Sequence, residues 1–395
     1  MKTTVKSLLT LLAASLMLMS CGNDDTADII IYDNSTTNNG GGSNPPSNDV
    51  INISGTYTQD LTLNSNNSYL VNGPLVMAEG TTLTIPAGMT IEALSSGSDV
   101  YVAISQGAKI MAEGTAQEPI VFTSNSNNPA AGDWGGLILL GKAPINSVTG
   151  GTETATSEIG SLPYGGNVAD DDSGILRYVR VEYSGGKADG QSENNGFSFY
   201  GVGNSTTVEY VQMYEGLDDG FEFFGGSVNV SYLSVVDAQD DSIDWTEGYS
   251  GTINHAYVMH GADHDKGIEA DGYNTDIGNN SNPVFWSTPT VNNLAIYGLG
   301  SGTGNEAIRL RAGTRVIMNN VWIEGFNEGI DMDDMETGVG VTSDITSITD
   351  ITFTDVNLKL KNDTGETFTD TDVISGDGNG TATDYATWGA GWTVE

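Results

Sequence analysis

The stretch YVQMYEGLDDGFEFFGGSVNVSYLSVVDAQDDSIDWT, residues 210–246, contains the same pair of apolar-polar patterns twice. A first short segment is anchored by Val211 and a second by Phe221, and equivalent anchors return at Leu233 and Ile243, 22 residues later in each case. Alternation of apolar and polar side chains over four to six residues, bounded by Gly and Asp, is typical of short, half-buried β-strands. The stretch therefore predicts a repeating unit of two short strands.

The same two strand types alternate strictly across the second half of the chain. Most full periods are 22 to 27 residues long, and longer ones contain polar inserts, which predict loops at 185–196 and 272–290. A further inserted loop is expected near 142–173. The first strand type is anchored by Val179, Val211, Leu233, Ala256, Leu294 and Val321, and the second by Phe197, Phe221, Ile243, Ile268, Ile308 and Ile330.

Short strands at this period, joined by turns too short to contain crossover helices, predict an all-β solenoid in which the coils stack through parallel ladders. A leucine-rich repeat has a similar period, but its leucine and asparagine consensus is absent. Phrases such as GTTLTIPAGMTIEA (80–93) extend the coils toward the N-terminus. We therefore expect residues 51–395 to form a single parallel β-helix domain.

The first twenty residues have the features of an export signal, with two lysines, an apolar core and a small residue before Cys21. Cys21 is the only cysteine, so no intramolecular disulfide can form. The LMSC stretch that ends at this residue resembles the bacterial lipobox, which implies lipidation of Cys21 and attachment to a membrane. Residues 21–50 are rich in polar residues and glycine and predict a flexible tether.

Several motifs resemble those of β-helix surface lipoproteins in Bacteroidota and, more distantly, a leptospiral outer-membrane lipoprotein group. This resemblance implies an outer-membrane location with display at the cell surface. The opening coils are similar to right-handed parallel β-helices of the pectin-lyase class, which implies the right-handed form of the fold. The motifs are CGNDD (21–25), GDWGGLILLGKAPIN (132–146), GLDDGFEFFGG (216–226), DDSIDWTEGYSG (240–251) and WGAGWT (388–393).

In the second strand type, alternation predicts that Phe221 and Phe223 point into the coil while Glu222 points out of it. Equivalent outward positions should stack about 4.8 Å apart, so neighbouring carboxylates would repel one another. Three interpretations follow: a solvated row in which Arg309 bridges Glu269 and Asp331, a bound Ca²⁺ ion, or a glycan-processing pair of carboxylates. The predicted column is Ser198, Glu222, Asp244, Glu269, Arg309 and Asp331.

Acidic pairs at the corners before these strands strengthen the Ca²⁺ hypothesis, although their spacing does not match an EF-hand. Asp218 with Asp219 and Asp240 with Asp241 precede equivalent strands 22 residues apart, so they should lie one above the other. Ca²⁺ is thus the cofactor that we expect. Its candidate ligands are Asp218, Asp219, Glu222, Asp240, Asp241, Asp244, Asp263, Asp265, Glu269 and Asp271.

All three histidines, His255, His260 and His264, lie within ten residues of one another. We favour structural or surface roles for them, because the strand that His255 and His260 flank has a regular apolar pattern. A Zn²⁺ or Cu²⁺ site and general acid-base catalysis are the alternatives.

The formal net charge of −39, from 52 acidic and 13 basic residues, excludes a nucleic-acid-binding role, because phosphates require clustered Lys and Arg. The function that we expect is that of a non-enzymatic outer-membrane lipoprotein whose acidic, Ca²⁺-stabilised β-helix binds a polysaccharide or an envelope protein. The alternative is a carbohydrate-active β-helix enzyme, either a polysaccharide lyase or a glycoside hydrolase. Elements similar to those of pectin-fold hydrolases occur in the wrong order, so no catalytic residue is assigned.

Overall fold

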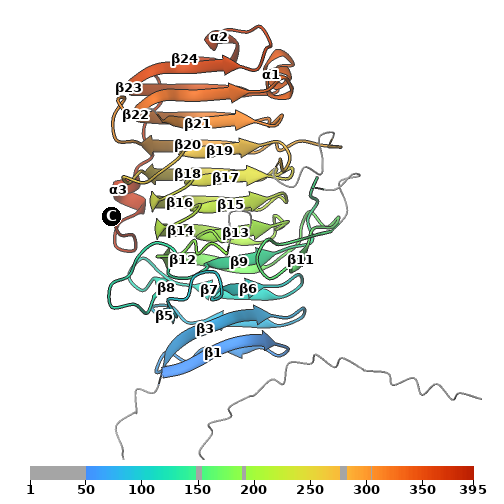
Figure 1. Cartoon of the computed structure of the whole chain (residues 1–395), viewed down its shortest axis with the longest axis vertical. Coiled ribbons are helices and arrows are strands. Elements are labelled where there is room, and N and C mark those ends of the chain that lie inside the picture. Colours follow the sequence, from blue (N-terminus) through green and yellow to red (C-terminus); the bar gives the residue numbers. More distant parts are fainter. Residues whose placement is uncertain (1–49, 148–153, 189–192, 276–282, 304) are drawn as a thin grey trace, which may run out of the picture. The chain divides into compact units, whose positions relative to one another are not determined.

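The protein folds as a stack of coils joined by parallel strands, as a computed structural model shows (Figure 1). The structure describes residues 50–147, 154–188, 193–275, 283–303 and 305–395. Among these residues, 22 strands belong to one continuous sheet in which every strand pair is parallel, and only the small hairpin β10–β11 is antiparallel. The prediction of an all-β parallel β-helix is confirmed. The predicted signal peptide (1–20) and residues 21–49 of the predicted tether lie outside the described residues.

The strands of the first half are β1 (Val50–Tyr57), β2 (Leu61–Thr62), β3 (Ser68–Met77), β4 (Thr82–Ile85), β5 (Thr90–Ala93), β6 (Val102–Ile104), β7 (Lys109–Glu113), β8 (Ile120–Ser124), β9 (Leu137–Leu140), β10 (Ala155–Thr156), β11 (Pro163–Tyr164), β12 (Gly174–Glu182) and β13 (Phe197–Tyr200). Those of the second half are β14 (Thr207–Gly216), β15 (Phe221–Phe224), β16 (Asn229–Ala238), β17 (Ile243–Thr246), β18 (Thr252–Met259), β19 (Ile268–Asp271), β20 (Thr290–Tyr297), β21 (Glu306–Arg311), β22 (Ile317–Asp333), β23 (Ser347–Asp363) and β24 (Ile374–Asp377). The helices are α1 (Met335–Thr342), α2 (Asp370–Val373) and α3 (Tyr385–Trp388). None of the helices in the described part of the chain has the length and apolarity needed to cross a membrane.

Both predicted columns of anchors form, in register from coil to coil. Strands β12, β14, β16, β18 and β20 carry the first type, and β13, β15, β17, β19 and β21 carry the second; β22 continues both columns in one long strand (Figure 1). Register is maintained because each inward side chain packs on its equivalent in the neighbouring coil and each apolar pair leaves water together. The core is therefore one continuous apolar file along the stack.

Aromatic side chains illustrate this packing in the second column. The ring of Phe221 stacks on that of Phe197, with centroids 4.5 Å apart and an interplanar angle of 3°. Phe223 lies between Phe199, at 5.2 Å, and Tyr249, at 4.4 Å. All five rings are fully buried, so this part of the core gains both apolar burial and ring contacts.

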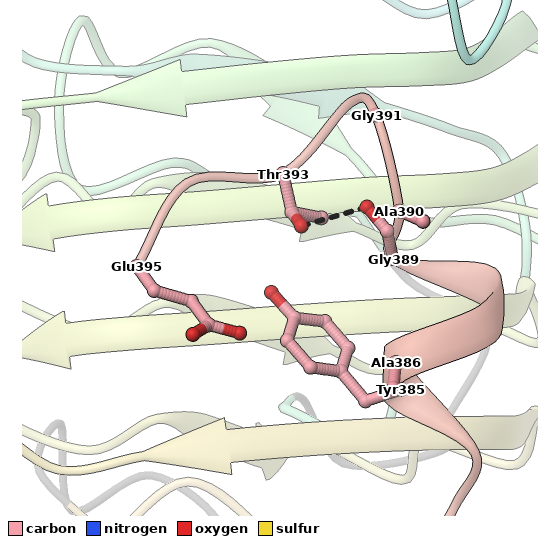
Figure 2. A pocket seen from close by; sticks show the side chains of 7 residues that line it. All are labelled: Tyr385, Ala386, Gly389, Ala390, Gly391, Thr393 and Glu395. Carbon is pink, nitrogen blue, oxygen red and sulfur yellow. Dashed lines mark hydrogen bonds between the residues drawn. The ribbon is translucent and has the colours of Figure 1, made fainter.

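The C-terminal segment returns along the outside of the stack, so that α3 lies beside strands of the first column (Figure 1). The Tyr385 ring stacks on Tyr257 at 3.7 Å, and its hydroxyl oxygen lies 3.2 Å from that of Ser234. Trp392 is fully buried, and its indole lies edge-on against Tyr210. The C-terminal segment lines an open pocket of about 340 Å³, where Thr393 donates a hydrogen bond to the Gly389 carbonyl (Figure 2); its lining residues are Tyr385, Ala386, Gly389, Ala390, Gly391, Thr393 and Glu395.

Candidate metal centre

The outward column of the second strand type forms in the predicted order. Backbone pairing places Ser198 beside Glu222, Glu222 beside Asp244, and Asp244 beside Glu269. The column continues through Arg309 and Asp331 and then through Lys361, which was not predicted. Carboxylates that are far apart in the sequence are thus brought to successive strand positions on one flank.

This column is only partly exposed to water, so the interpretation as a freely solvated surface row is wrong. Its side chains point away from the apolar core, as alternation requires, yet Ser198 is 2% exposed, Glu269 9% and Asp331 4%, while Glu222, Asp244 and Arg309 are half-buried. Asn195 from an inserted loop donates hydrogen bonds to Glu222 Oε2 at 2.7 Å and to Ser198 Oγ at 3.1 Å. Alternation identifies the face of the strand, but a covering loop decides whether that face meets water.

Two of the predicted inserted loops are joined to each other beside β17. Asn146, in the segment between β9 and β12, donates hydrogen bonds to the carbonyl oxygens of Gly272 and Phe285, in the segment between β19 and β20. Glu247, at the end of β17, accepts hydrogen bonds from Tyr164 at 2.8 Å and from Asn274 at 3.1 Å. The two loops are thus anchored to the coil and to one another by buried polar contacts.

The aromatic residues of the last loop pack against the stack. A side chain on Gly248 would collide with the Phe285 ring, and one on Gly313 would collide with the Trp286 ring. The guanidinium of Arg315 lies 5.0 Å from the centre of the Trp286 ring. These rings therefore hold the loop on the coil.

The corner acids and the column acids form one connected cluster. Asp219 and Asp241 are linked directly, because Asp219 Oδ1 accepts a hydrogen bond of 2.9 Å from the Asp241 amide. The cluster contains four overlapping groups in which one carboxylate oxygen of each residue lies within 4.8 Å of the others. These groups are Asp218–Asp219–Asp240, Asp219–Glu222–Asp244, Asp240–Asp241–Asp265 and Asp241–Asp244–Glu269.

Two predicted ligands stand apart from these four groups. Asp271 is held by Arg311, whose Nε lies 2.6 Å from Asp271 Oδ1. Asp263 is exposed and lines a separate cavity of about 310 Å³ together with Glu215 and Asp237. Eight of the ten predicted ligands therefore come together, and neither Asp263 nor Asp271 shares a group with them.

Arg309 does not bridge Glu269 and Asp331, so that prediction is wrong. Its guanidinium instead contacts Asp333 at 2.7 Å. Glu269 is paired with Arg311 and, at 3.0 Å, with Lys266, whereas Asp331 is paired with Lys361 at 2.8 Å. The long arginine side chain can reach carboxylates beyond the residues that are paired with it in the ladder, so strand pairing alone does not fix its partner.

One of the four groups differs from the rest in having no ion pair to a basic side chain within the described residues. Asp219, Glu222 and Asp244 form this base-free trio, whereas Lys187 or Lys266 contacts the other groups. Asp244 Oδ1 is buried and has no hydrogen-bond partner among the described residues. A buried carboxylate oxygen without a hydrogen-bond partner destabilises the folded state unless it is protonated or binds a cation.

Burial raises the pKa of five carboxyl groups in this cluster. It raises the pKa of Asp218 to about 8 and holds those of Asp219, Glu222, Asp241 and Asp244 well above their usual range. Nearby negative charges act in the same direction; for Glu222, the charge of Asp244 is the next largest cause. Protons and cations are therefore alternative means of neutralising the same oxygens.

The three histidines do not form one site. His255 stacks on Tyr232 with ring centroids 4.9 Å apart, whereas the His260 ring lies 4.0 Å from that of His264. Burial lowers the pKa of His260 to about 3, so its ring is neutral. In the described residues no candidate metal group includes a histidine, and the packing of these rings supports the structural roles.

Lys187, Lys266 and Asn195 complete the site, and the sequence alone did not single them out. Lys187 and Asn195 belong to an inserted loop that has no periodic pattern, so their direction could not be inferred. Lys266 lies two residues before the strand that carries Glu269. A basic residue at that acidic corner was the one feature of the sequence that could have identified it as an ion-pair partner.

Similarity to known proteins lies in the coil stack itself. No curated protein and no solved structure matches the chain. A family described as the pectate-lyase-like β-helix domain matches residues 55–393, which contain every described strand from β2 to β24 and the whole acidic column. The chain therefore belongs to the family of pectate-lyase-like β-helix domains.

Proposed function

We propose that this protein is a lipid-anchored β-helix of the outer membrane that binds Ca²⁺ at Asp219, Glu222 and Asp244 and displays its acidic stack to a polysaccharide or envelope protein, without catalysis. The base-free trio is the observation that carries the Ca²⁺ site. The lipobox-like sequence before Cys21 and its likeness to Bacteroidota surface lipoproteins support the anchor and the display.

The trio has the chemistry of a Ca²⁺ site. Ca²⁺ prefers oxygen ligands and accepts carboxylates in irregular arrangements, and three carboxylates supply both the oxygens and the compensating charge. The cover over the column favours a small ion over a sugar chain at this point. Asp219 is 7% exposed, Glu222 and Asp244 are half-buried, and the cavities of about 340 and 310 Å³ described above are lined by other residues.

Calorimetric titration of the metal-free protein, from Cys21 onward, with Ca²⁺ tests the site. We expect saturable binding whose tightest step the Glu222→Gln variant abolishes, because the amide keeps the shape of the side chain but removes its charge. Mg²⁺ should bind more weakly, since it requires a regular octahedral shell and gives up water reluctantly. Absence of Ca²⁺ binding at millimolar concentration would show that the proposal is wrong.

The stability of the metal-free protein should fall as pH rises from about 5 to about 8. The raised pKa values mean that the folded state keeps protons that the unfolded state has already released, so each rise in pH favours unfolding until the folded carboxyls ionise. Melting temperatures in EGTA at pH 5, 6.5 and 8 measure this slope. Saturating Ca²⁺ should flatten it, because the ion binds the ionised carboxylates; equal slopes with and without Ca²⁺ would contradict the assignment.

A carbohydrate-active enzyme is the second candidate, and membership of a pectate-lyase-like family favours it. Arg311 beside Glu269 and Asp271 offers a basic group next to carboxylates, as β-elimination from an acidic sugar requires. A screen of polysaccharides for reducing ends and for unsaturated products distinguishes the two candidates. Product formation that is lost in Asp244→Asn would overturn the non-enzymatic proposal.

A further inference from the structure

Two lysine ammonium groups contact carboxylates that share a group with a member of the base-free trio. Lys187 Nζ lies 3.1 Å from Asp218 Oδ1, 3.3 Å from Asp240 Oδ2 and 3.0 Å from Glu193 Oε1. Lys266 Nζ contacts Glu269 at 3.0 Å. Each ammonium thus occupies a position among carboxylates where a cation would be attracted.

The two lysines differ in how firmly they are held. The Lys266 side chain is 5% exposed, and its backbone amide is itself bonded to Asp241 Oδ1 at 2.7 Å. The Lys187 side chain is 29% exposed and reaches the corner acids from an inserted loop. The Lys187 ammonium can therefore be displaced into solvent by a side-chain movement, whereas the Lys266 side chain is enclosed at its corner.

The corner acids retain binding capacity that Lys187 does not use. Asp218 is 3% exposed, yet its Oδ2 atom is buried without a hydrogen-bond partner among the described residues. One carboxylate oxygen from each of Asp218, Asp219 and Asp240 lies within 4.8 Å of the others. The single charge of Lys187 is shared among Asp218, Asp240 and Glu193, so these groups remain under-neutralised.

We infer that Asp218, Asp219 and Asp240 form a second divalent-cation site, which the Lys187 ammonium occupies as a tethered counter-ion and must vacate before Ca²⁺ binds. The inference rests on the proposed function, because the second site shares Asp219 with the first. A divalent ion brings twice the charge of the ammonium, but it must displace Lys187 and it is repelled by the ion in the neighbouring site. The second site therefore binds Ca²⁺ more weakly than the first, and Lys187 determines the difference in affinity.

Calcium titration of Lys187→Met tests this inference, because methionine keeps an unbranched side chain without the charge. We expect the second binding step to become tighter by about tenfold or more, since a positive charge close to the site is removed. Lys187→Arg should keep the second step weak. Lys142→Met is the matched control: Lys142 pairs with Glu79 at 2.9 Å, away from the cluster, and both steps should stay as in the parent.

Failure of this inference can be told from failure of the proposed function. If Glu222→Gln leaves the first step intact, the proposed trio is wrong; if Lys187→Met leaves the second step at the parental affinity, the second site is wrong. Lys187→Met should also melt lower than the parent in EGTA and recover in Ca²⁺. Should it not fold in either buffer, Asp240→Asn carries the test, because it must remove the second step and retain the first.

Discussion

The Asp244→Asn variant should melt at a higher temperature than the parent protein in EGTA and should lose the part of the Ca²⁺ stabilisation that comes from the base-free trio. Asp244 lies between Glu222 and Glu269 in the column, so at a pH at which Asp244 is ionised the neutral amide removes repulsion on the order of 1 kcal/mol from the metal-free state. It also removes a ligand, and with it about 2.7 kcal/mol of stabilisation at a Ca²⁺ concentration 100 times the dissociation constant. Thermal melting with and without Ca²⁺ measures both changes.

Asp263→Asn is the control for this experiment, because Asp263 was a predicted ligand that the structure places outside the four carboxylate groups. Its melting temperature should respond to Ca²⁺ as that of the parent does. If Asp244→Asn and Asp263→Asn lose the Ca²⁺ response to the same extent, the stabilisation comes from the overall acidity of the chain and not from the trio.

Phe223→Ala should destabilise the protein by about 3–5 kcal/mol, as large-to-small substitutions of buried aromatic residues do. Phe223 is fully buried, and its ring stacks on Phe199 in one neighbouring coil and on Tyr249 on the other side. Truncation therefore leaves a cavity in the middle of a file that the flanking coils cannot close without breaking their ladders. Urea unfolding in the presence of Ca²⁺ measures the loss of free energy.

The size-matched comparison is Phe223→Leu, which keeps most of the apolar volume and should cost clearly less. A small effect of Phe223→Ala, within about 0.5 kcal/mol of the parent, would mean that this position behaves as a surface site. It would then contradict the inward direction of Phe223 and, with it, the outward direction of Glu222.

The coil architecture and the order of the acidic column could be predicted from the sequence because both depend on local alternation and on a repeat period. Once Val211 and Leu233 are recognised as equivalent anchors, a parallel ladder in register fixes which residues of β14 and β16 lie side by side. The same reasoning pairs Glu222 with Asp244 and Asp244 with Glu269, as the structure shows.

Whether the column meets water, and which charges pair within it, could not be predicted in this way. Asn195, from an inserted loop, covers Glu222 and donates a hydrogen bond to it. Asn146 connects the other two loops through hydrogen bonds to Gly272 and Phe285, which are more than 100 residues away in the sequence. These loops have no period, so nothing local indicates where they fold back. Long side chains such as Arg309 add the same uncertainty at shorter range, because several carboxylates lie within their reach.

The sequence by itself determined the parallel coils, their register and the vertical row of acids, because a strand of period two in a repeating coil leaves one register that keeps apolar residues inside. Only the tertiary structure decided that the row is partly covered, that Lys266 and Arg311 pair with Glu269, and that Asp219, Glu222 and Asp244 have no ion pair among the described residues. The physical reason is that ion pairing and burial depend on distances in space between residues from separate loops, which no local pattern records.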